Sequence, residues 1–131
     1  MTDQLAGKRI LIVEDQAMIA ESLAFEITAK GAEVIGPVET VDALEAIANT
    51  DLDGVILDLK LRGEMAFPVA DVLAERNIPF VFLTGYGAHD VPARHANVPR
   101  VEKPVTPRVV CRTLEAAMSS AHSADTSGRS T

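Results

Sequence analysis

Residues 8–15, KRILIVED, place a short run of mostly β-branched apolar residues directly before two carboxylates. An almost unbroken apolar run of this length predicts a strand that is buried on both faces of its sheet. Residues 54–58, GVILD, have the same form and again end in a carboxylate. Two buried strands of this kind in one short chain indicate a parallel sheet that helices cover on both faces.

Strand-like runs and amphipathic stretches alternate along the whole chain. We expect strands at residues 8–13, 33–38, 54–57, 78–83 and 98–101. We expect helices at residues 16–30, after a cap at Thr40, from near Phe67 to Arg76, and from the cap Thr106 to Ala121. Pro37 predicts an edge position or a strand end for the second strand. Pro92 and a scarcity of apolar residues predict that any fourth helix, between residues 87 and 98, is short or irregular.

The composition is typical of one packed domain. The chain has 131 residues, of which 47% are hydrophobic and 24% are charged, the usual balance for a globular core. Its formal net charge of −7 argues against nucleic-acid binding, because the phosphate backbone selects for clustered Lys and Arg. We expect one domain over residues 1–121 and a disordered tail over residues 122–131, where small polar residues dominate. From this length we expect no output domain.

Cysteine content, hydropathy and the N-terminal sequence together predict a cytoplasmic protein. Cys111 is the only cysteine, so no internal disulfide can form, and we expect it to be a buried apolar residue of the last helix. No apolar run reaches about 18 residues, so we expect no membrane span. The N-terminus lacks the basic start and apolar stretch of a signal peptide. We expect the histidines, His95 among them, to lie at the surface.

Polar residues follow the predicted strands at the points where those strands end. Glu14 and Asp15 follow the first strand, Asp58 the third, Thr84 the fourth and Lys103 the fifth. In a doubly wound parallel sheet, ligands collect at the carboxyl ends of the strands, near the point where the strand order reverses. We therefore expect three carboxylates, one hydroxyl and one ammonium group to share one pocket.

The charges of this pocket predict a metal ion. Glu14, Asp15 and Asp58 concentrate three negative charges, and such a cluster raises its own pKa values unless a cation lies within it. Lys103 offsets one charge and a divalent cation offsets the other two. Hard oxygen ligands favour Mg²⁺, whereas zinc prefers His or Cys. A carboxylate beside a metal, a hydroxyl and an ammonium group is suited to phosphoryl transfer through an acyl phosphate.

Four motifs in this order resemble the receiver domain of two-component response regulators over residues 7–121. They are Glu14-Asp15 after ILIV, Asp58 in VILDLKL, Thr84 in VFLTGYG and Lys103 in VEKPV. Each motif alone could be only a helix cap or a surface group. All four stand at the correct strand ends, and because four such coincidences are improbable, a functional site is the favoured interpretation. The resemblance implies a flavodoxin-like (βα)5 fold, a doubly wound α/β sandwich with a five-stranded parallel sheet of order 2-1-3-4-5.

The resemblance also implies how the protein signals. Asp58 would be the phosphoacceptor, which takes a phosphoryl group from a sensor histidine kinase or a histidine phosphotransfer protein. Thr84 would be the switch hydroxyl, and Lys103 would contact the phosphoryl group. Self-phosphorylation and autodephosphorylation would depend on Mg²⁺. Without an output domain, the signal would run through a downstream protein target or through phosphate flow, and a homodimer through the last helix stays open.

The same resemblance implies a ligand set for the metal ion. Glu14, Asp15 and Asp58 would hold Mg²⁺, with the backbone carbonyl of Lys60 as a further ligand. Lys60 lies two residues after the phosphoacceptor, where its bulk is expected to modulate hydrolysis of the phosphoryl group.

The segment FLTGYG is similar to a subgroup of stand-alone receivers that carry a Phe-Ala-Thr-Gly-aromatic-aromatic motif. The sequence departs from that motif at Leu83 and at Gly87. It also has Arg100 where ordinary receivers carry a rotating Tyr or Phe, three residues before the lysine, and we expect Arg100 to be a surface residue. Tyr86, two residues after Thr84, is the candidate for replacing that switch aromatic and for modulating hydrolysis.

Two other functions are compatible with part of this pattern. A small Mg²⁺-dependent aspartyl-nucleophile phosphatase uses the same residue types, but it places its nucleophile after the first strand and a second Asp two residues later. Here Lys60 stands two residues after Asp58, and the acidic pair comes first. An unphosphorylated binding module with a receiver-like fold is the other alternative.

Overall fold

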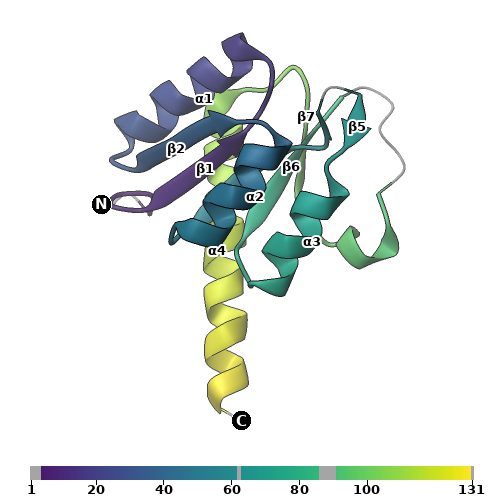
Figure 1. Ribbon diagram of the computed structural model, residues 1–131. Helices are drawn as coiled ribbons and strands as arrows, with labels where there is room; N and C mark the ends of the chain where they lie inside the picture. The colour runs from purple at the N-terminus through teal and green to yellow at the C-terminus, as the bar shows by residue number, and fades with distance from the viewer. Residues whose placement is uncertain (1–3, 62, 86–90, 131) are drawn as a thin grey trace.

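A computed structural model describes the backbone of residues 4–61, 63–85 and 91–130 (Figure 1). Within these ranges the side chains of Val41 and of residues 121–130 are not described. Tyr86, Gly87 and His89 lie outside the described residues, so the predictions that concern them are untested.

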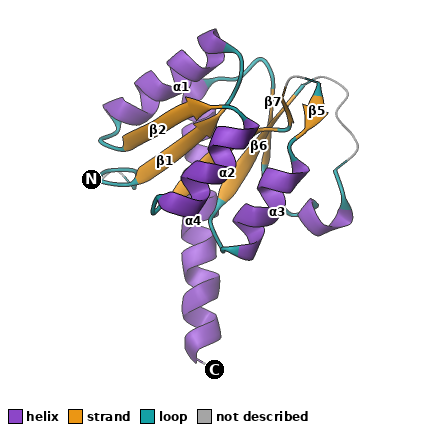
Figure 2. Ribbon diagram, viewed as in Figure 1, coloured by secondary structure: helices purple, strands orange, loops and turns teal. Residues whose placement is uncertain are grey.

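Five parallel strands form the central sheet (Figure 2). They are β1 (Arg9–Val13), β2 (Glu33–Val38), β3 (Gly54–Asp58), β6 (Phe80–Thr84) and β7 (Arg100–Glu102). Their spatial order is β2-β1-β3-β6-β7. This confirms the predicted doubly wound order, with β6 and β7 as the fourth and fifth strands, and it confirms the edge position of the strand that contains Pro37.

Helices cover both faces of this sheet. Helices α1 (Ala17–Ala29) and α4 (Pro107–Ser130) pack on one face, and α2 (Thr40–Asn49) and α3 (Phe67–Glu75) pack on the other, in front of the sheet in Figure 2. Alternate residues of each strand point to opposite faces. In β1, Ile10 and Ile12 therefore enter the core beneath α1 and α4, whereas Leu11 and Val13 enter the core beneath α2 and α3.

The connections differ from the predictions in two places. A hairpin of β4 (Lys60–Leu61) and β5 (Glu64–Met65) follows the phosphoacceptor candidate, and its two-residue strands are too short to produce a hydrophobic period. Thr40 is the first residue of α2 and not its cap, a position that Glu39 takes. Between β6 and β7, the described residues contain one 3₁₀ turn, η1 (Ala93–His95), which agrees with the short or irregular fourth helix.

Helix α4 is longer than the sequence predicts. Its backbone is helical as far as Ser130 and extends beyond the sheet (Figure 1), whereas the sequence predicts a disordered tail over residues 122–131. The sequence after Pro107 contains no proline that would interrupt the helix. The division into a domain over residues 1–121 and a tail stays a prediction.

Three predictions about single residues can be compared with their burial. Cys111 is buried and Arg100 is exposed, as predicted. The prediction for His95 is wrong, because His95 is buried among three phenylalanine rings. Within the described ranges, no helix has the length and apolar character that crossing a membrane requires.

A bulge in β2 is made possible by a glycine. Leu11 pairs with Ile35 but Val13 pairs with Val38, so Gly36 and Pro37 lie opposite a single residue of β1. Gly36 has a φ of +91°, and a Cβ there would lie 2.9 Å from both the carbonyl oxygen of Ile12 and the amide nitrogen of Val38. Backbone atoms within the sheet cannot move away from such a contact, so only glycine fits this position.

We expect Gly36→Ala to destabilise the protein more than Gly63→Ala does. Gly63 also has a positive φ, but no atom lies within 4 Å of the place that an alanine methyl group would take there. Both variants therefore carry backbone strain of about 1–2 kcal/mol, and only Gly36→Ala adds a backbone clash. The free energy of unfolding, measured by urea denaturation, tests this difference, and equal losses in the two variants would contradict it.

Candidate functional site

The carboxyl ends of the strands bring the predicted site residues together. Glu14 and Asp15 directly follow β1, Asp58 ends β3, Thr84 ends β6 and Lys103 follows β7. Glu14, Asp58 and Thr84 are buried, whereas Asp15 is exposed. The site therefore has a buried floor and an exposed carboxylate at its rim.

Lys103 reaches across this edge to the buried carboxylates. Its Nζ atom lies 2.8 Å from Asp58 Oδ2 and 3.5 Å from Glu14 Oε2. The side chain of Asp58 is only 4% exposed and that of Lys103 is 19% exposed, so little water screens their charges. Truncating one partner of such a pair leaves the other charge buried and uncompensated.

Opposing effects act on the pKa of Lys103. Burial on its own would lower this pKa, because it disfavours the charged form. The hydrogen bond and the negative charge of Asp58, together with the charge of Glu14, outweigh burial and raise the pKa above its usual value. Lys103 is therefore an ammonium ion at neutral pH.

Glu14 is the carboxylate that this environment perturbs most clearly. Burial, aided by its contact with Asp58 and by the charge of Asp58, raises the pKa of Glu14 to about 7. The backbone N–H of Gln16 donates to Glu14 Oε1 at 3.0 Å and, like the charge of Lys103, acts in the opposite direction. Glu14 thus changes between its neutral and ionised forms near neutral pH.

Backbone hydrogen bonds fix Asp58 and Thr84 relative to their neighbours. The N–H of Lys60 donates to Asp58 Oδ1 at 3.1 Å. The N–H of Lys103 donates to the carbonyl oxygen of Thr84 at 2.8 Å. Because Asp58 pairs with Leu83 in the ladder between β3 and β6, Thr84 lies one residue beyond Asp58 along the neighbouring strand.

The carboxylates have the arrangement that a hard divalent cation needs. Glu14, Asp15 and Asp58 each offer an oxygen, and these oxygens all lie within 4.8 Å of one another. Glu14 Oε2 is buried and has no hydrogen-bond partner among the described residues, and its 3.5 Å approach to Lys103 is an ion pair only. An oxygen of this kind is stabilised by a bound cation. The donor set therefore fits Mg²⁺.

Gln16 is a site residue that the sequence did not single out. Lys103 Nζ donates to Gln16 Oε1 at 3.5 Å, so the ammonium group faces Gln16 as well as the two buried carboxylates. A signal was present, because Gln16 directly follows the acidic pair at the same strand end.

Regulators of transcription are among the relatives of this chain, although no protein-family model matches it. It is 33% identical over 96 residues to the transcriptional regulatory protein PdtaR of Mycobacterium tuberculosis, covering 70% of this chain and 46% of that protein. It is 30% identical over 121 residues to the phosphate regulon transcriptional regulatory protein PhoB of Pseudomonas aeruginosa, covering 87% of this chain and 53% of that protein. The chain thus spans about half the length of these regulators.

Two solved structures match the chain over almost the whole length of the matched protein. SdrG from Sphingomonas melonis is 38% identical, with a TM-score of 0.74 over 86% of this chain and 96% of SdrG. A CheY-like response regulator receiver domain protein from Methanospirillum hungatei shares the fold, with a TM-score of 0.78 at 22% identity over 90% of this chain and 98% of that chain. With the acidic pocket and strand order described above, these matches show that the chain belongs to the response regulator receiver domains of two-component systems.

Proposed function

We propose that this protein accepts a phosphoryl group on Asp58 as one step of a two-component phosphorelay. The observation that carries the proposal is the 2.8 Å contact between Lys103 Nζ and Asp58 Oδ2, in a site with two buried carboxylates and an exposed third one, Asp15, at its rim. A single buried carboxylate with a purely structural role would need only one positively charged partner to balance its charge. Here an ammonium group, a hydroxyl and two further carboxylates surround it, and this set of groups is suited to phosphoryl transfer.

The transfer step conserves one phosphoryl group. A carboxylate oxygen of Asp58 attacks the phosphorus of a phosphohistidine, a P–O bond forms, and the P–N bond to the imidazole breaks. The imidazole keeps the electron pair and takes up a proton. The product is an acyl phosphate on Asp58, and water later attacks it to release inorganic phosphate and restore the carboxylate.

Glu14, Asp15, Asp58 and the backbone carbonyl of Lys60 are the groups that would hold Mg²⁺. When bound, Mg²⁺ supplies positive charge against the phosphoryl oxygens. Lys103 supplies the second positive charge, because its ammonium group already points at Asp58. Glu14 has to be ionised to act as a ligand, so its raised pKa makes metal binding depend on pH.

Thr84 is the residue that would respond to phosphorylation of Asp58. Phosphorylation of Asp58 adds about one negative charge and three acceptor oxygens. The Thr84 hydroxyl, at the end of the neighbouring strand, donates to one of these oxygens. A differential contact of this kind is what a conformational change requires, and the glycine that follows, Gly85, eases backbone rearrangement.

The partners follow from the family. The phosphoryl donor is a sensor histidine kinase or a histidine phosphotransfer protein, and the signal continues through a protein target or through phosphate flow, in the cytoplasm. The similarity of FLTGYG to the Phe-Ala-Thr-Gly subgroup supports a stand-alone receiver. The net charge of −7 favours protein partners over nucleic acid.

Two alternatives make different predictions for Asp58. A small aspartyl-nucleophile phosphatase would turn over phosphomonoesters continuously, whereas a receiver accepts one phosphoryl group on its aspartate and later loses it by hydrolysis. An unphosphorylated binding module would function equally well with Asn at position 58. The intact pocket of Glu14, Asp58 and Lys103 argues against the binding module.

Incubation with Mg²⁺ and acetyl phosphate is expected to add the mass of one phosphoryl group to the protein. The adduct should map to Asp58, because this carboxylate lies beside the ammonium group of Lys103. Intact-mass and peptide mass spectrometry measure both. Asp58→Asn should abolish the adduct, and Asp51→Asn, an exposed carboxylate before β3, is the matched control. A folded protein that gains no adduct would refute the proposal.

Mg²⁺ is expected to bind more tightly as the pH rises from 6 to 8. Glu14, with a pKa of about 7, is mostly protonated at pH 6, and protons compete with the metal for its carboxylate. Glu14→Gln should weaken binding by about ten-fold or more at pH 8 and reduce the pH dependence. Isothermal titration calorimetry gives the dissociation constants, with Glu26→Gln on α1 as the control. Affinity that does not change with pH in the unaltered protein would contradict this role.

Met18 is expected to contact the protein that donates the phosphoryl group. This side chain is 83% exposed and lies in the first turn of α1, three residues after Asp15. An exposed apolar residue at the rim of a site suits a protein interface. Met18→Arg should slow transfer from a phosphohistidine protein by about ten-fold and leave phosphorylation by acetyl phosphate unchanged. If Met18→Arg and the parent protein take up phosphate from the phosphohistidine protein at the same rate, this contact is excluded.

A further inference from the structure

His95 is a buried titratable residue that the proposed phosphoryl transfer does not use. Only 2% of its side chain is exposed. Its ring stacks on Phe67 of α3 and meets Phe80 and Phe82 of β6 edge-on, with centroid distances of 6.1–6.2 Å. These rings hold the turn η1 against the face of the sheet that α2 and α3 cover.

Asp71 of α3 binds both basic residues of that turn. Its Oδ1 atom lies 2.7 Å from His95 Nε2 and 2.7 Å from Arg94 Nε, and its Oδ2 atom accepts from Arg94 Nη2 at 3.2 Å. A carboxylate can only accept, so His95 Nε2 carries the hydrogen. Hydrogen bonds from Arg94 and His95 hold the pKa of Asp71 below its usual value, so the carboxylate is charged at neutral pH.

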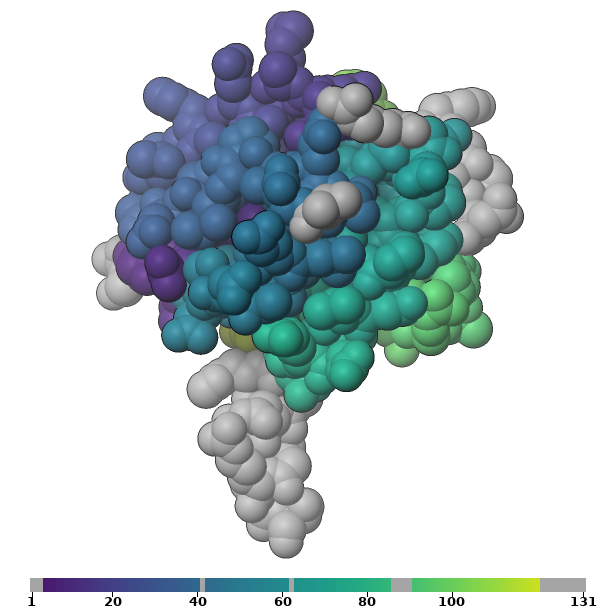
Figure 3. Space-filling model, in the orientation of Figure 1, coloured from purple at the N-terminus to yellow at the C-terminus, as the bar shows by residue number. Residues whose placement is uncertain are grey.

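We call residues 91–98 the 91–98 segment. Asp71 connects this segment to the rest of the domain through side-chain hydrogen bonds. The backbone hydrogen bonds of His95, Ala96 and Val98 N–H groups all end within the segment itself. For the part of the chain that the structure describes, the side-chain hydrogen bonds from this segment to other elements all end on Asp71. In Figure 3 the segment lies beside α3 at the edge of the molecule.

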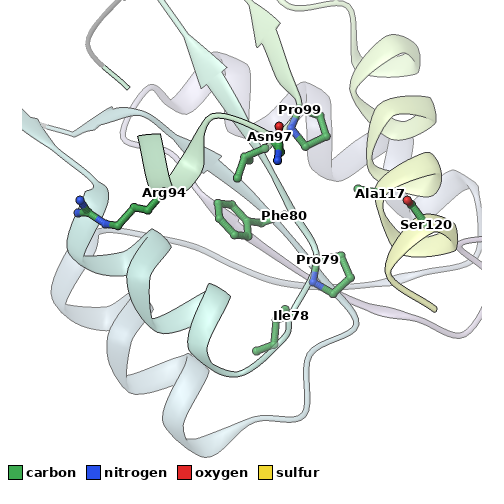
Figure 4. Close-up of a pocket in the computed structure, with 9 residues that line it drawn as sticks. Ile78, Pro79, Phe80, Arg94, Asn97, Pro99, Ala117 and Ser120 are labelled. Atoms are coloured by element: carbon green, nitrogen blue, oxygen red, sulfur yellow. The ribbon is translucent and has the colours of Figure 1, made fainter. Parts of the chain in front are cut away.

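The opposite side of the segment borders an open hollow. This hollow has a volume of about 360 Å³ and lies between the segment, the start of β6 and α4. Its lining includes Phe80, Asn97 and Pro99 on one side and Ala117 and Ser120 of α4 on the other (Figure 4). The segment is therefore bonded to α3 through Asp71 and has open space toward α4, and Arg94 takes part in both, because it binds Asp71 and also lines the hollow.

Strand β6 connects this arrangement to the phosphoacceptor site. Thr84 ends β6 at the site, and Phe82, two residues earlier on the same face of the strand, packs edge-on against His95. Strand β6 is hydrogen-bonded to β3 on one side and to β7 on the other, so Phe82 and Thr84 belong to one backbone element held within the sheet. A displacement of Thr84 toward a phosphorylated Asp58 would thus reach the ring that holds η1.

We propose that Asp71 is a latch that holds the 91–98 segment on α3 in the unphosphorylated protein, and that phosphorylation of Asp58 releases the segment toward the hollow beside α4. This inference rests on the proposed function of Asp58. Asp71, 13 residues after Asp58 in the sequence, would then control how often the released position of the segment is populated.

Amide NMR of the full chain tests the latch. Spectra are recorded without ligand and with Mg²⁺ and beryllium fluoride, which mimics a phosphorylated carboxylate. We expect Asp71→Ala, without ligand, to move the resonances of residues 91–98 along the line that joins the two states of the parent protein. We also expect hydrogen exchange at His95, Ala96 and Val98 to rise by about ten-fold. Arg94→Gln, at an exposed position, should act in the same direction with a smaller effect.

Filling the hollow provides a second, opposite test. Ser120→Phe places a large ring where the released segment would move, so the response of residues 91–98 to beryllium fluoride should decrease. Ser119→Phe, a neighbouring exposed position that does not line the hollow, is the matched control. Glu26→Gln, which breaks an ion pair on the other face of the sheet, controls for the loss of charge.

The outcomes separate the latch from the proposed function. If beryllium fluoride changes the chemical shifts of Thr84 and Lys103 but not those of residues 91–98, the latch is wrong and the proposed function still stands. Unchanged exchange in Asp71→Ala, or resonances that leave the line between the two parent states, would overturn it as well, because Asp71 would then be only a structural contact. No shift at Thr84 or Lys103 in the folded parent protein would instead overturn the proposed function.

Discussion

The ion pair between Lys103 and Asp58 is the interaction on which the functional edge of this protein depends. A parallel sheet brings the ends of its strands together, so Glu14 and Asp58 are forced into one buried place. Two buried carboxylates repel each other, and the 2.8 Å contact with the lysine offsets part of that repulsion. Burial, aided by the remaining repulsion from Asp58, raises the pKa of Glu14 to about 7. The pocket is thus prepared for a cation and for a phosphoryl group.

The same sheet carries information away from this edge. Its strands alternate between two cores, and on the α2 and α3 side the rings of Phe80 and Phe82 pack against each other and against His95. Packed rings transmit small displacements because interiors are dense and resist compression. In the proposed function, a charge added at Asp58 would therefore act on packing as well as on hydrogen bonds.

Most of the architecture could be predicted from local patterns. Buried strands such as the one that ends at Asp58 are visible as apolar runs, and Pro68 marks the start of α3 at Phe67. The candidate site was predictable because each of its residues stands at a strand end. The burial of His95 was not, since the rings that bury it come from Phe67, Phe80 and Phe82, and no period in the sequence joins these positions.

The sequence by itself determined the order of strands and helices and the set of chemical groups at the carboxyl edge, because hydrophobic period and strand-end position are local properties. Only the tertiary structure decided how those groups meet: that Lys103 points at Asp58, that Gln16 joins them, and that Asp71 binds His95 and Arg94. These contacts link residues 23 to 87 positions apart. Such distances are spanned by packing and burial, which depend on the whole fold and not on any one stretch of chain.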